Sequence, residues 1–227
     1  MGTPDFAVAA LEALHDAGHE IVGVYTRMDT PKNRGMKMLP PPVKVKALEY
    51  GIPVYQPKNL RGEDTQQELR DLAPEAIIVA AYGRILPQAV LDIPKYGCLN
   101  IHASLLPKYR GASPINACIL HGETEAGVTI MQMDEGLDTG DMIMKTEIVL
   151  DEKDMQEEYF FVGLRMVQGV SLKRFEEQFG VSAESVYPGL LERLIREGVA
   201  ECVDDQFRLT EFGMDVSNYA MAEFLQE

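Results

Sequence analysis

The stretch Ala76-Ile-Ile-Val-Ala-Ala81 is apolar at every position, which predicts a strand buried on both faces of a parallel sheet. Cys98-Leu-Asn-Ile-His102 predicts a second strand further along the chain. Amphipathic segments at residues 4–17 and 43–50 predict helices, and the second stops at Gly51, a common residue after a helix end. Strands that alternate with helices indicate an α/β domain with a Rossmann-like, mainly parallel sheet.

Other elements are expected on either side of these two strands. Thr65 and Glu68 match a capping box for a helix that ends near Leu72. Ser113 followed by Pro114 suits the N-cap and the first position of a helix that runs to residue 121. Residues 27–42 are rich in Lys, Arg, Gly and Pro and predict a loop. Further strands are predicted at residues 20–25, 53–55, 128–132 and 142–150.

The first strand of such a sheet is expected to be missing. A doubly wound fold opens with an apolar strand, a tight turn and a helix, and Gly2-Thr-Pro-Asp5 resembles the turn. The sequence starts at Met1, directly before that turn. Because the first strand of a doubly wound sheet lies centrally, we expect a gap inside the sheet and not a shortened edge.

Composition excludes several classes of protein. The 227 residues are 46% hydrophobic and 25% charged, which argues against wholesale disorder. The net charge of −15 argues against a protein that binds nucleic acid over its whole surface, although a local basic patch is compatible with it. No apolar run is long enough for a membrane span, and no signal peptide is recognisable. Three widely spaced cysteines match no zinc or redox pattern, which suggests reduced thiols in a cytoplasmic protein.

The charge is distributed unevenly and suggests two domains. Residues 1–150 carry 19 acidic and 14 basic side chains, whereas residues 151–227 carry 17 acidic and 7 basic ones. The pattern also changes near residue 150, from alternating strands and helices to mostly helices. We therefore expect one domain over residues 1–150 and a second over residues 151–227.

Asn100 and His102 are two positions apart on the predicted strand, so their side chains point to the same face. They lie at the carboxyl end of the strand, where open α/β sheets bind ligands. An imidazole beside a carboxamide can stabilise the oxyanion that forms when a nucleophile attacks a carbonyl. The alternative is a histidine that merely satisfies its hydrogen bonds at a strand end, and the spacing alone does not distinguish the two.

The loop Met133-Asp-Glu-Gly-Leu-Asp-Thr-Gly-Asp141 concentrates four acids between glycines and allows three interpretations. The first is a calcium loop that starts at Asp134. Such a loop needs an acid at its twelfth position, but that position holds Lys145, which argues against calcium. A solvated turn is the second interpretation. The third is a catalytic carboxylate that orients the histidine and moves protons through water.

Longer motifs resemble the methionyl-tRNA formyltransferase family. They are Asn100-Ile-His-Ala-Ser-Leu-Leu-Pro107, Arg110-Gly-Ala-Ser-Pro-Ile115, Met131-Gln-Met-Asp-Glu-Gly-Leu-Asp-Thr-Gly-Asp141, Gly2-Thr-Pro-Asp-Phe6, Pro42-Val-Lys44 and Ala81-Tyr-Gly-Arg-Ile-Leu-Pro87. The resemblance covers residues 2–150 and lacks the family's first strand, its last catalytic-domain elements and its C-terminal tRNA-binding barrel. It implies transfer of a formyl group from 10-formyltetrahydrofolate to the amino group of initiator methionyl-tRNA, at the start of translation.

The resemblance also implies roles for individual residues. Asn100, His102 and Asp138 would be the catalytic trio, with no metal. The implied folate contacts are Gly83, Arg84, Ile85, Leu86, Ser104, Leu105, Leu106, Pro107, Asp134 and Gly136. The implied tRNA contacts are Arg27, Lys32, Arg34, Lys37 and Lys44, in a loop for which a solvated flexible loop is the alternative.

The tail resembles a different family. Glu152-Lys-Asp-Met-Gln-Glu-Glu-Tyr-Phe-Phe-Val-Gly-Leu-Arg165, Gly169-Val-Ser-Leu-Lys-Arg-Phe175 and Leu209-Thr-Glu-Phe-Gly213 resemble the C-terminal domain of oxygen-independent coproporphyrinogen oxidase-like heme chaperones. This implies a small helical, winged-helix-like domain, without the cysteine-bound iron–sulfur half of that family. Its charge argues against DNA binding. The residue pattern agrees with a winged-helix-like domain. One apolar helix face is formed by Phe160, Phe161 and Leu164, and another by Val186, Leu190, Leu191, Leu194 and Ile195. Residues 200–203 and 207–209 flank Asp204-Asp205 as a wing-like hairpin.

The chain therefore reads as a chimera of two fragments joined near residues 151–154. Three alternatives to a methionyl-tRNA formyltransferase stay open. The chain could formylate another amine, such as that of a sugar nucleotide or a ribonucleotide. It could be an inert fusion whose broken sheet cannot position the trio. It could also be a heme- or partner-binding module dominated by the tail.

Overall fold

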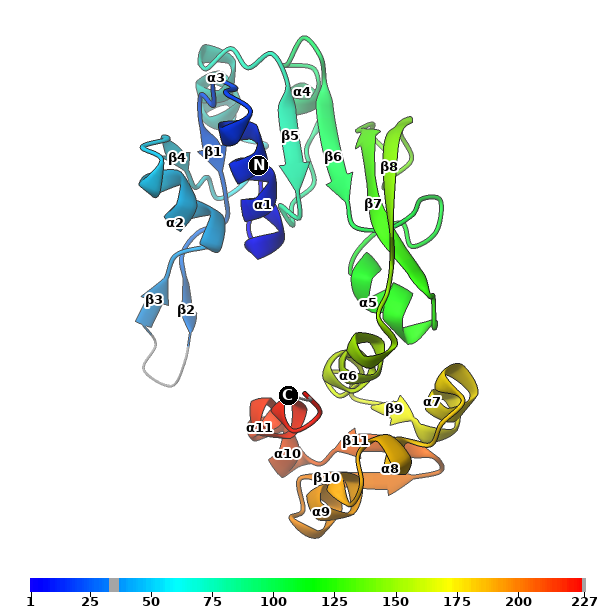
Figure 1. Cartoon of the computed structure of the whole chain (residues 1–227). Coiled ribbons are helices and arrows are strands. Elements are labelled where there is room, and N and C mark those ends of the chain that lie inside the picture. The colour runs from blue at the N-terminus through cyan, green and yellow to red at the C-terminus, as the bar shows by residue number, and fades with distance from the viewer. Residues whose placement is uncertain (33–36, 226–227) are drawn as a thin grey trace. The chain divides into compact units, whose positions relative to one another are not determined.

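A computed structural model of the chain describes residues 1–32 and 37–225, and its backbone forms two compact units (Figure 1). The first unit contains residues 1–112 and 127–146. The second contains residues 113–126 and the described residues from 147 onward. The boundary at residues 150 and 151 therefore stays a prediction, because the backbone packing divides the chain at other points.

The strands of the first unit confirm a sheet that is rich in parallel pairs. Strand β5 (Ile77–Ala80) lies parallel to β6 (Cys98–His102), and β1 (Val24–Tyr25) lies parallel to β4 (Val54–Tyr55). Strand β7 (Glu125–Gln132) pairs with β6 in the antiparallel direction. Strand β8 (Met142–Val149) closes the four-stranded order β5-β6-β7-β8.

Helices cover the sheet through two separate apolar clusters. Helices α1 (Asp5–Asp16) and α2 (Pro42–Glu49) contribute Ala7, Leu11, Val43 and Ala47 to one cluster, which also holds Val24 and Ala80. Helix α3 (Glu63–Asp71) and the short α4 (Gln88–Leu91) contribute Leu69, Val90 and Leu91 to the other, which also holds Ile77 and Val79. Neighbouring residues of β5 thus contact different clusters, which is why its sequence is apolar throughout.

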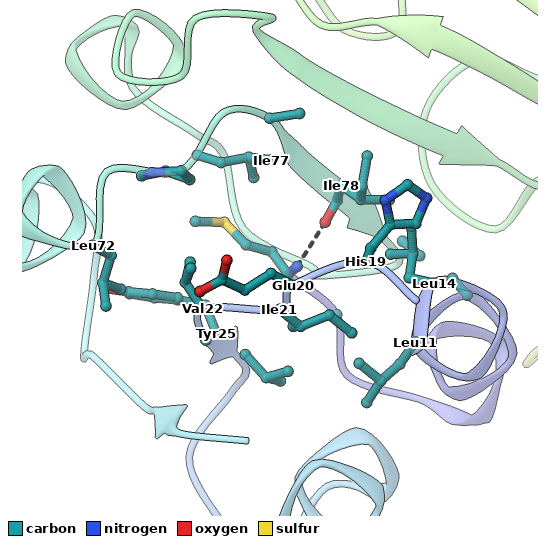
Figure 2. Close-up of a pocket in the computed structure, with 18 of the residues that line it drawn as sticks. Leu11, Leu14, His19, Glu20, Ile21, Val22, Tyr25, Leu72, Ile77 and Ile78 are labelled. Carbon is teal, nitrogen blue, oxygen red and sulfur yellow. Dashed lines mark hydrogen bonds between the residues drawn. The ribbon is translucent and has the colours of Figure 1, made fainter. Parts of the chain in front are cut away.

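The expected gap in the sheet lies between β1 and β5. Among the described residues, only Met1 and Gly2 enter this position (Figure 1). The Gly2 N–H donates to the Tyr25 carbonyl at 3.0 Å, and the Ala80 N–H donates to the Met1 carbonyl at 2.9 Å. Next to Met1 and Gly2, residues of β1 and β5 line a cavity of about 550 Å³ (Figure 2).

Two local predictions were wrong, and a third was right in position but not in its capping contact. Residues 27–42 contain a hairpin, β2 (Thr30–Lys32) paired with β3 (Lys37–Leu39), so they are not all loop. Helix α3 begins at Glu63 after Gly62, so Thr65 lies inside the helix and caps nothing. The helix predicted after Ser113 is confirmed, with Ser113 at the N-cap position and Pro114 at the start of the helix, but Ser113 has a left-handed φ of 58° and its side chain makes no capping hydrogen bond. Each error arises because a short motif was interpreted without its surroundings.

The second unit is helical with a small sheet, as predicted for the tail. Strands β10 (Ala200–Val203) and β11 (Gln206–Leu209) form the predicted hairpin, and β9 (Val170–Ser171) pairs with β11. Its helices are α5 (Pro114–Leu120), α6 (Glu152–Gly163), α7 (Leu172–Phe179), α8 (Ala183–Val186), α9 (Leu190–Arg196), α10 (Glu211–Asp215) and α11 (Ser217–Ala222).

An aromatic core holds the second unit together. Phe160 is fully buried, stacks on Phe224 with ring centroids 4.2 Å apart, and meets the edge of Tyr187. Ile119 of α5 belongs to the same cluster, although its sequence lies in the formyltransferase-like part. Ile195 is 42% exposed, so its predicted place on an apolar core face was wrong.

Strand β8 has apolar side chains that no other part of the described chain covers. It is the last strand of the sheet, and all eight of its residues are exposed. The large apolar side chains among them are Met142, Ile143, Met144, Ile148 and Val149.

The three cysteines differ in exposure and should differ in reactivity. Burial raises the pKa of the Cys98 thiol to about 11, so little of it is the reactive thiolate at neutral pH. Cys118 is also buried, whereas Cys202 is exposed. We expect iodoacetamide to label Cys202 in the folded protein and all three thiols in urea, as read by intact mass. Equal labelling of Cys98 and Cys202 under native conditions would contradict this packing.

No helix in the described parts of the chain is long and apolar enough to cross a membrane.

Candidate active site

Strand β6 places Asn100 and His102 at the carboxyl end of a central strand. Its parallel pairing with β5 is continuous from Cys98 to Ile101, and its antiparallel pairing with β7 sets His102 opposite Thr129. His102 is only 6% exposed. The strand predicted from the sequence is thus observed with the same limits, and it holds both side chains on a fixed backbone.

Asp138 joins the two side chains. Its Oδ1 accepts a hydrogen bond from Asn100 Nδ2 at 3.1 Å, and its Oδ2 lies 3.5 Å from His102 Nδ1. The same Oδ2 accepts the backbone N–H of Gly111 at 2.8 Å. Asp138 has a left-handed φ of 52°, and its side chain is 12% exposed. The carboxylate is therefore mostly shielded from solvent, well hydrogen-bonded and able to orient both neighbours.

The other ring nitrogen of His102 faces the protein backbone. His102 Nε2 lies 2.8 Å from the carbonyl oxygen of Tyr109. A carbonyl oxygen can only accept, so Nε2 carries the proton in this hydrogen bond. Tyr109 itself has a left-handed φ of 57°, an uncommon conformation for a residue with a side chain. The loop after β6 is thus folded over the imidazole.

Thr129 fixes this loop and was missed by the sequence analysis. Its hydroxyl donates to the Ser104 carbonyl at 2.7 Å and accepts the Leu106 N–H at 3.1 Å, and the residue is fully buried. The signal in the sequence was the polar Thr129 within the strand predicted at residues 128–132.

Replacing Thr129 with Val should destabilise the protein by about 1–3 kcal/mol, because a carbonyl and an N–H would stay buried without partners. Chemical unfolding would measure the loss. Thr139→Val is the matched control, since Thr139 is exposed and bonds only within its own turn, to Asp134. An equal effect of the two substitutions would contradict the role of Thr129.

The residues implied as folate contacts lie on three segments with different exposure. Ser104 and Leu106 are buried, and the Ser104 hydroxyl donates to the Lys108 carbonyl at 2.8 Å. Leu105 is half-buried and Pro107 is exposed. The Leu106 carbonyl accepts the Lys145 ammonium. Hydrogen bonds within the segment and from Lys145 therefore hold residues 104–107 in place.

The second segment includes one side chain that reaches into solvent. Gly83 has a left-handed φ of 71°, and Ile85 is 82% exposed beside the buried Leu86. The Arg84 guanidinium donates to the Lys58 carbonyl. An exposed isoleucine next to a buried leucine leaves an apolar edge that a flat ligand could cover.

The acidic loop forms the third segment. Asp134 is exposed and accepts the Gly136 N–H at 2.9 Å. Leu137 is 70% exposed and lies next to Gly111. Within residues 1–32 and 37–225, no group of three or more His, Cys, Asp or Glu is placed to bind a metal ion.

The five residues implied as tRNA contacts have different surroundings. Lys44 binds Asp29 at 2.8 Å and Gln56 at 2.8 Å, and this ammonium holds the pKa of the Asp29 carboxyl below its usual value. Arg27 is exposed and its guanidinium lies beside Gly83. The backbones of Lys32 and Lys37 pair in the β2–β3 hairpin. Arg34 lies outside the described residues.

Curated relatives are similar to about two thirds of the chain. A methionyl-tRNA formyltransferase of Marinobacter nauticus is 61% identical over 153 residues, which is 67% of this chain and 49% of the relative. One of Geobacter metallireducens is 57% identical over 148 residues, which is 65% of this chain and 48% of the relative. The chain thus spans about half the length of the curated relatives it matches.

Solved structures support the same fold. A phosphoribosylglycinamide formyltransferase from Bacillus halodurans has a TM-score of 0.53 at 25% identity and covers 66% of this chain and 78% of its own. A glycinamide ribonucleotide transformylase from Symbiobacterium toebii has a TM-score of 0.54 at 18% identity and covers 92% and 91%.

Two family models divide the sequence. The HemN C-terminal domain matches residues 150–216, in agreement with the resemblance found in the tail. The formyl transferase model matches residues 1–160, which include all three residues of the site on β6 and the acidic loop. This chain therefore belongs to the formyl transferase family.

Proposed function

We propose that this chain transfers a formyl group from a 10-formyltetrahydrofolate donor to the amino group of initiator methionyl-tRNA, in the cytoplasm. The observation that carries the proposal is the convergence of Asn100 and His102 on the mostly shielded carboxylate of Asp138, at 3.1 Å and 3.5 Å. An amide donor and an imidazole held in this way are suited to a carbonyl that becomes an oxyanion.

In this reaction the formyl carbon exchanges its bond to folate N10 for a bond to the methionine nitrogen, and one proton moves from that nitrogen to N10. The methionine amine attacks the formyl carbon, and a carbon–nitrogen bond forms while the carbonyl oxygen becomes an oxyanion. Asn100 Nδ2–H and His102 Nε2–H stabilise that oxygen. When the tetrahedral intermediate collapses, the bond between carbon and folate N10 breaks, and the proton lost by the amine ends on N10. Asp138 orients His102 and accepts this proton in passing, through water.

The Tyr109 carbonyl occupies the hydrogen-bonding position that the formyl oxygen needs. His102 Nε2 already donates in that direction, over 2.8 Å. Substrate binding would therefore exchange one acceptor for another, and the tautomer of the imidazole would stay the same. The left-handed backbone of Tyr109 favours such a movement, because leaving it relieves conformational strain.

The folate is proposed to lie along the three segments described above. Exposed Ile85 and Leu137 supply apolar area for a flat ring, and backbone groups of residues 104–107 supply polar contacts. The basic residues of the β2–β3 region would contact the phosphate backbone of the tRNA. Of these, Lys44 would have to leave Asp29 or bind the phosphate together with it.

The test is a formyl-transfer assay with labelled 10-formyltetrahydrofolate and three acceptors. Charged initiator tRNA should be formylated, whereas glycinamide ribonucleotide and an amino-sugar nucleotide should not. The ribonucleotide is included because the similar solved structures are named for that substrate. Preferential formylation of either small acceptor would replace the tRNA assignment. No transfer to any acceptor by a protein with a cooperative thermal transition would overturn the enzymatic proposal.

A further inference from the structure

Strand β8 presents a free edge and exposed apolar side chains. It ends the order β5-β6-β7-β8, so no strand in the described parts of the chain pairs with its other edge (Figure 1). An edge strand carries a row of unpaired backbone N–H and C=O groups, which can pair with the backbone of another strand. All eight of its residues are exposed, and its large apolar side chains range from 47% exposed at Met142 to 81% at Val149. A partner for this edge must therefore be an extended segment with apolar side chains at matching positions.

The sequence of β8 is itself such a segment. Met142-Ile-Met-Lys-Thr-Glu-Ile-Val149 is apolar at both ends, with Lys145 and Glu147 on either side of Thr146. If two copies of β8 run antiparallel with Thr146 opposite its own copy, Lys145 lies opposite Glu147 of the second copy. The same register brings apolar residues opposite each other: Met144 with Ile148, and Ile143 with Val149. Every opposite pair is then complementary, apolar with apolar, cation with carboxylate and hydroxyl with hydroxyl.

Charge selects this register over its nearest alternative. Opposite residues of two paired strands point to the same face, so a two-fold axis perpendicular to the sheet must pass beside a residue and not between two. The longest overlaps of β8 with its copy place that axis at Lys145 or at Thr146. An axis at Lys145 sets two ammonium groups opposite each other, which is destabilising. An axis at Thr146 pairs each ammonium with a carboxylate instead.

Both charged side chains can take part in this pairing. Glu147 is exposed, and within residues 1–32 and 37–225 its carboxylate has no ion-pair partner. The Lys145 ammonium donates to the Leu106 carbonyl, and its other N–H groups can donate to a second acceptor. A lysine on an edge strand ordinarily discourages pairing, because its charge would be buried without a counter-charge. Here the second copy supplies the counter-charge, so Lys145 disfavours strands that lack a matching carboxylate.

We propose that two copies of this chain associate through β8, as an antiparallel strand pair with its two-fold axis at Thr146. The pairing joins the two four-stranded sheets into one continuous sheet and covers both free edges, so association stops at a dimer. One pair of strands buries less area than a standard protein interface, so the dimer is weak and forms as the protein concentration rises.

Sedimentation velocity over a range of protein concentrations tests the proposal with charge variants. The wild-type chain should change from monomer to dimer as the concentration rises. Glu147→Lys should raise the dimer dissociation constant by about tenfold or more, because it sets Lys145 opposite a second lysine. The same substitution reduces the net negative charge of the chain, which by itself would favour association, so a weaker dimer must arise from local pairing. Adding Lys145→Glu should restore the dimer, because each pair is again of opposite charge.

Three outcomes of this experiment would overturn the proposal. They are a wild-type chain that stays monomeric at the highest soluble concentration, a dimer that Glu147→Lys does not weaken, and a double variant that does not regain the dimer although near-UV circular dichroism shows that it is folded. Species that grow beyond a dimer would show edge pairing without two-fold symmetry, which also contradicts the proposal.

Cross-linking tests the register directly. Thr146→Cys, made together with Cys202→Ser to remove the exposed native thiol, should form a disulfide between two copies under mild oxidation. Residues opposite each other in an antiparallel pair have Cα atoms about 4.5–5.5 Å apart, within the reach of a disulfide. Ile143→Cys in the same background is the control, because its two copies would lie about 20 Å apart along the strands. Equal cross-linking at both positions, read by non-reducing electrophoresis, would rule out the register centred on Thr146.

Discussion

His102→Ala should lower kcat for formyl transfer by about 10²–10³-fold, because it removes one donor to the oxyanion. The imidazole is 6% exposed and its two nitrogens contact the Asp138 carboxylate and the Tyr109 carbonyl. The KM for methionyl-tRNA should change much less, since no ground-state contact of the tRNA depends on this ring. Single-turnover kinetics with labelled formyl donor would separate the two quantities.

The control for this prediction is His15→Ala. His15 is an exposed histidine on α1, far from β6 in the sequence, and its ring stacks on Tyr50 with centroids 3.8 Å apart. It should retain full activity with at most a small loss of stability. If His102→Ala retained more than a tenth of the activity while its melting temperature was unchanged, His102 would not be the oxyanion donor.

Phe160→Ala should destabilise the second unit by about 3–5 kcal/mol, because it leaves a cavity in the centre of an aromatic cluster. Phe160 is fully buried, and its ring packs against those of Phe175, Tyr187, Phe207 and Phe224. Such a loss is comparable to the whole stability of many small domains. Urea unfolding followed by near-UV circular dichroism, which reports packed aromatic rings, would measure it.

Phe161 provides the matched control one position later. It is only partly buried and stacks against the Arg165 guanidinium, 4.4 Å from its ring centroid. Phe161→Ala should therefore cost clearly less than Phe160→Ala, since water can fill the space that the ring leaves. Equal losses would show that the aromatic cluster does not have the packing described here.

The sequence predicted the strands of the site well because their pattern is local. The unbroken apolar run at residues 76–81 contains the buried strand Ile77–Ala80, and the limits Cys98–His102 predicted for the next strand of the site were confirmed without change. Asn100, His102 and Asp138 lie together as the family motifs implied, and their catalytic roles stay predictions until activity is measured.

Other features depend on contacts that a sequence pattern does not show. Which acid of the loop reaches the histidine depends on the left-handed turn at Asp138, which alternation and spacing do not encode. The partnership of Thr129 with residues 104 and 106 joins positions more than twenty residues apart. Helix α5 has an apolar face, but its sequence does not say that Ile119 packs in the core of the second unit.

The exposed face of β8 also determines how this protein should behave in concentrated solution. An uncovered edge strand with apolar side chains is a template for pairing with another chain. The net charge of −15 keeps such chains apart by mutual repulsion. Added salt shortens the range of that repulsion and leaves the hydrophobic attraction intact. Moderate salt, which keeps many proteins in solution, should therefore promote aggregation of this one.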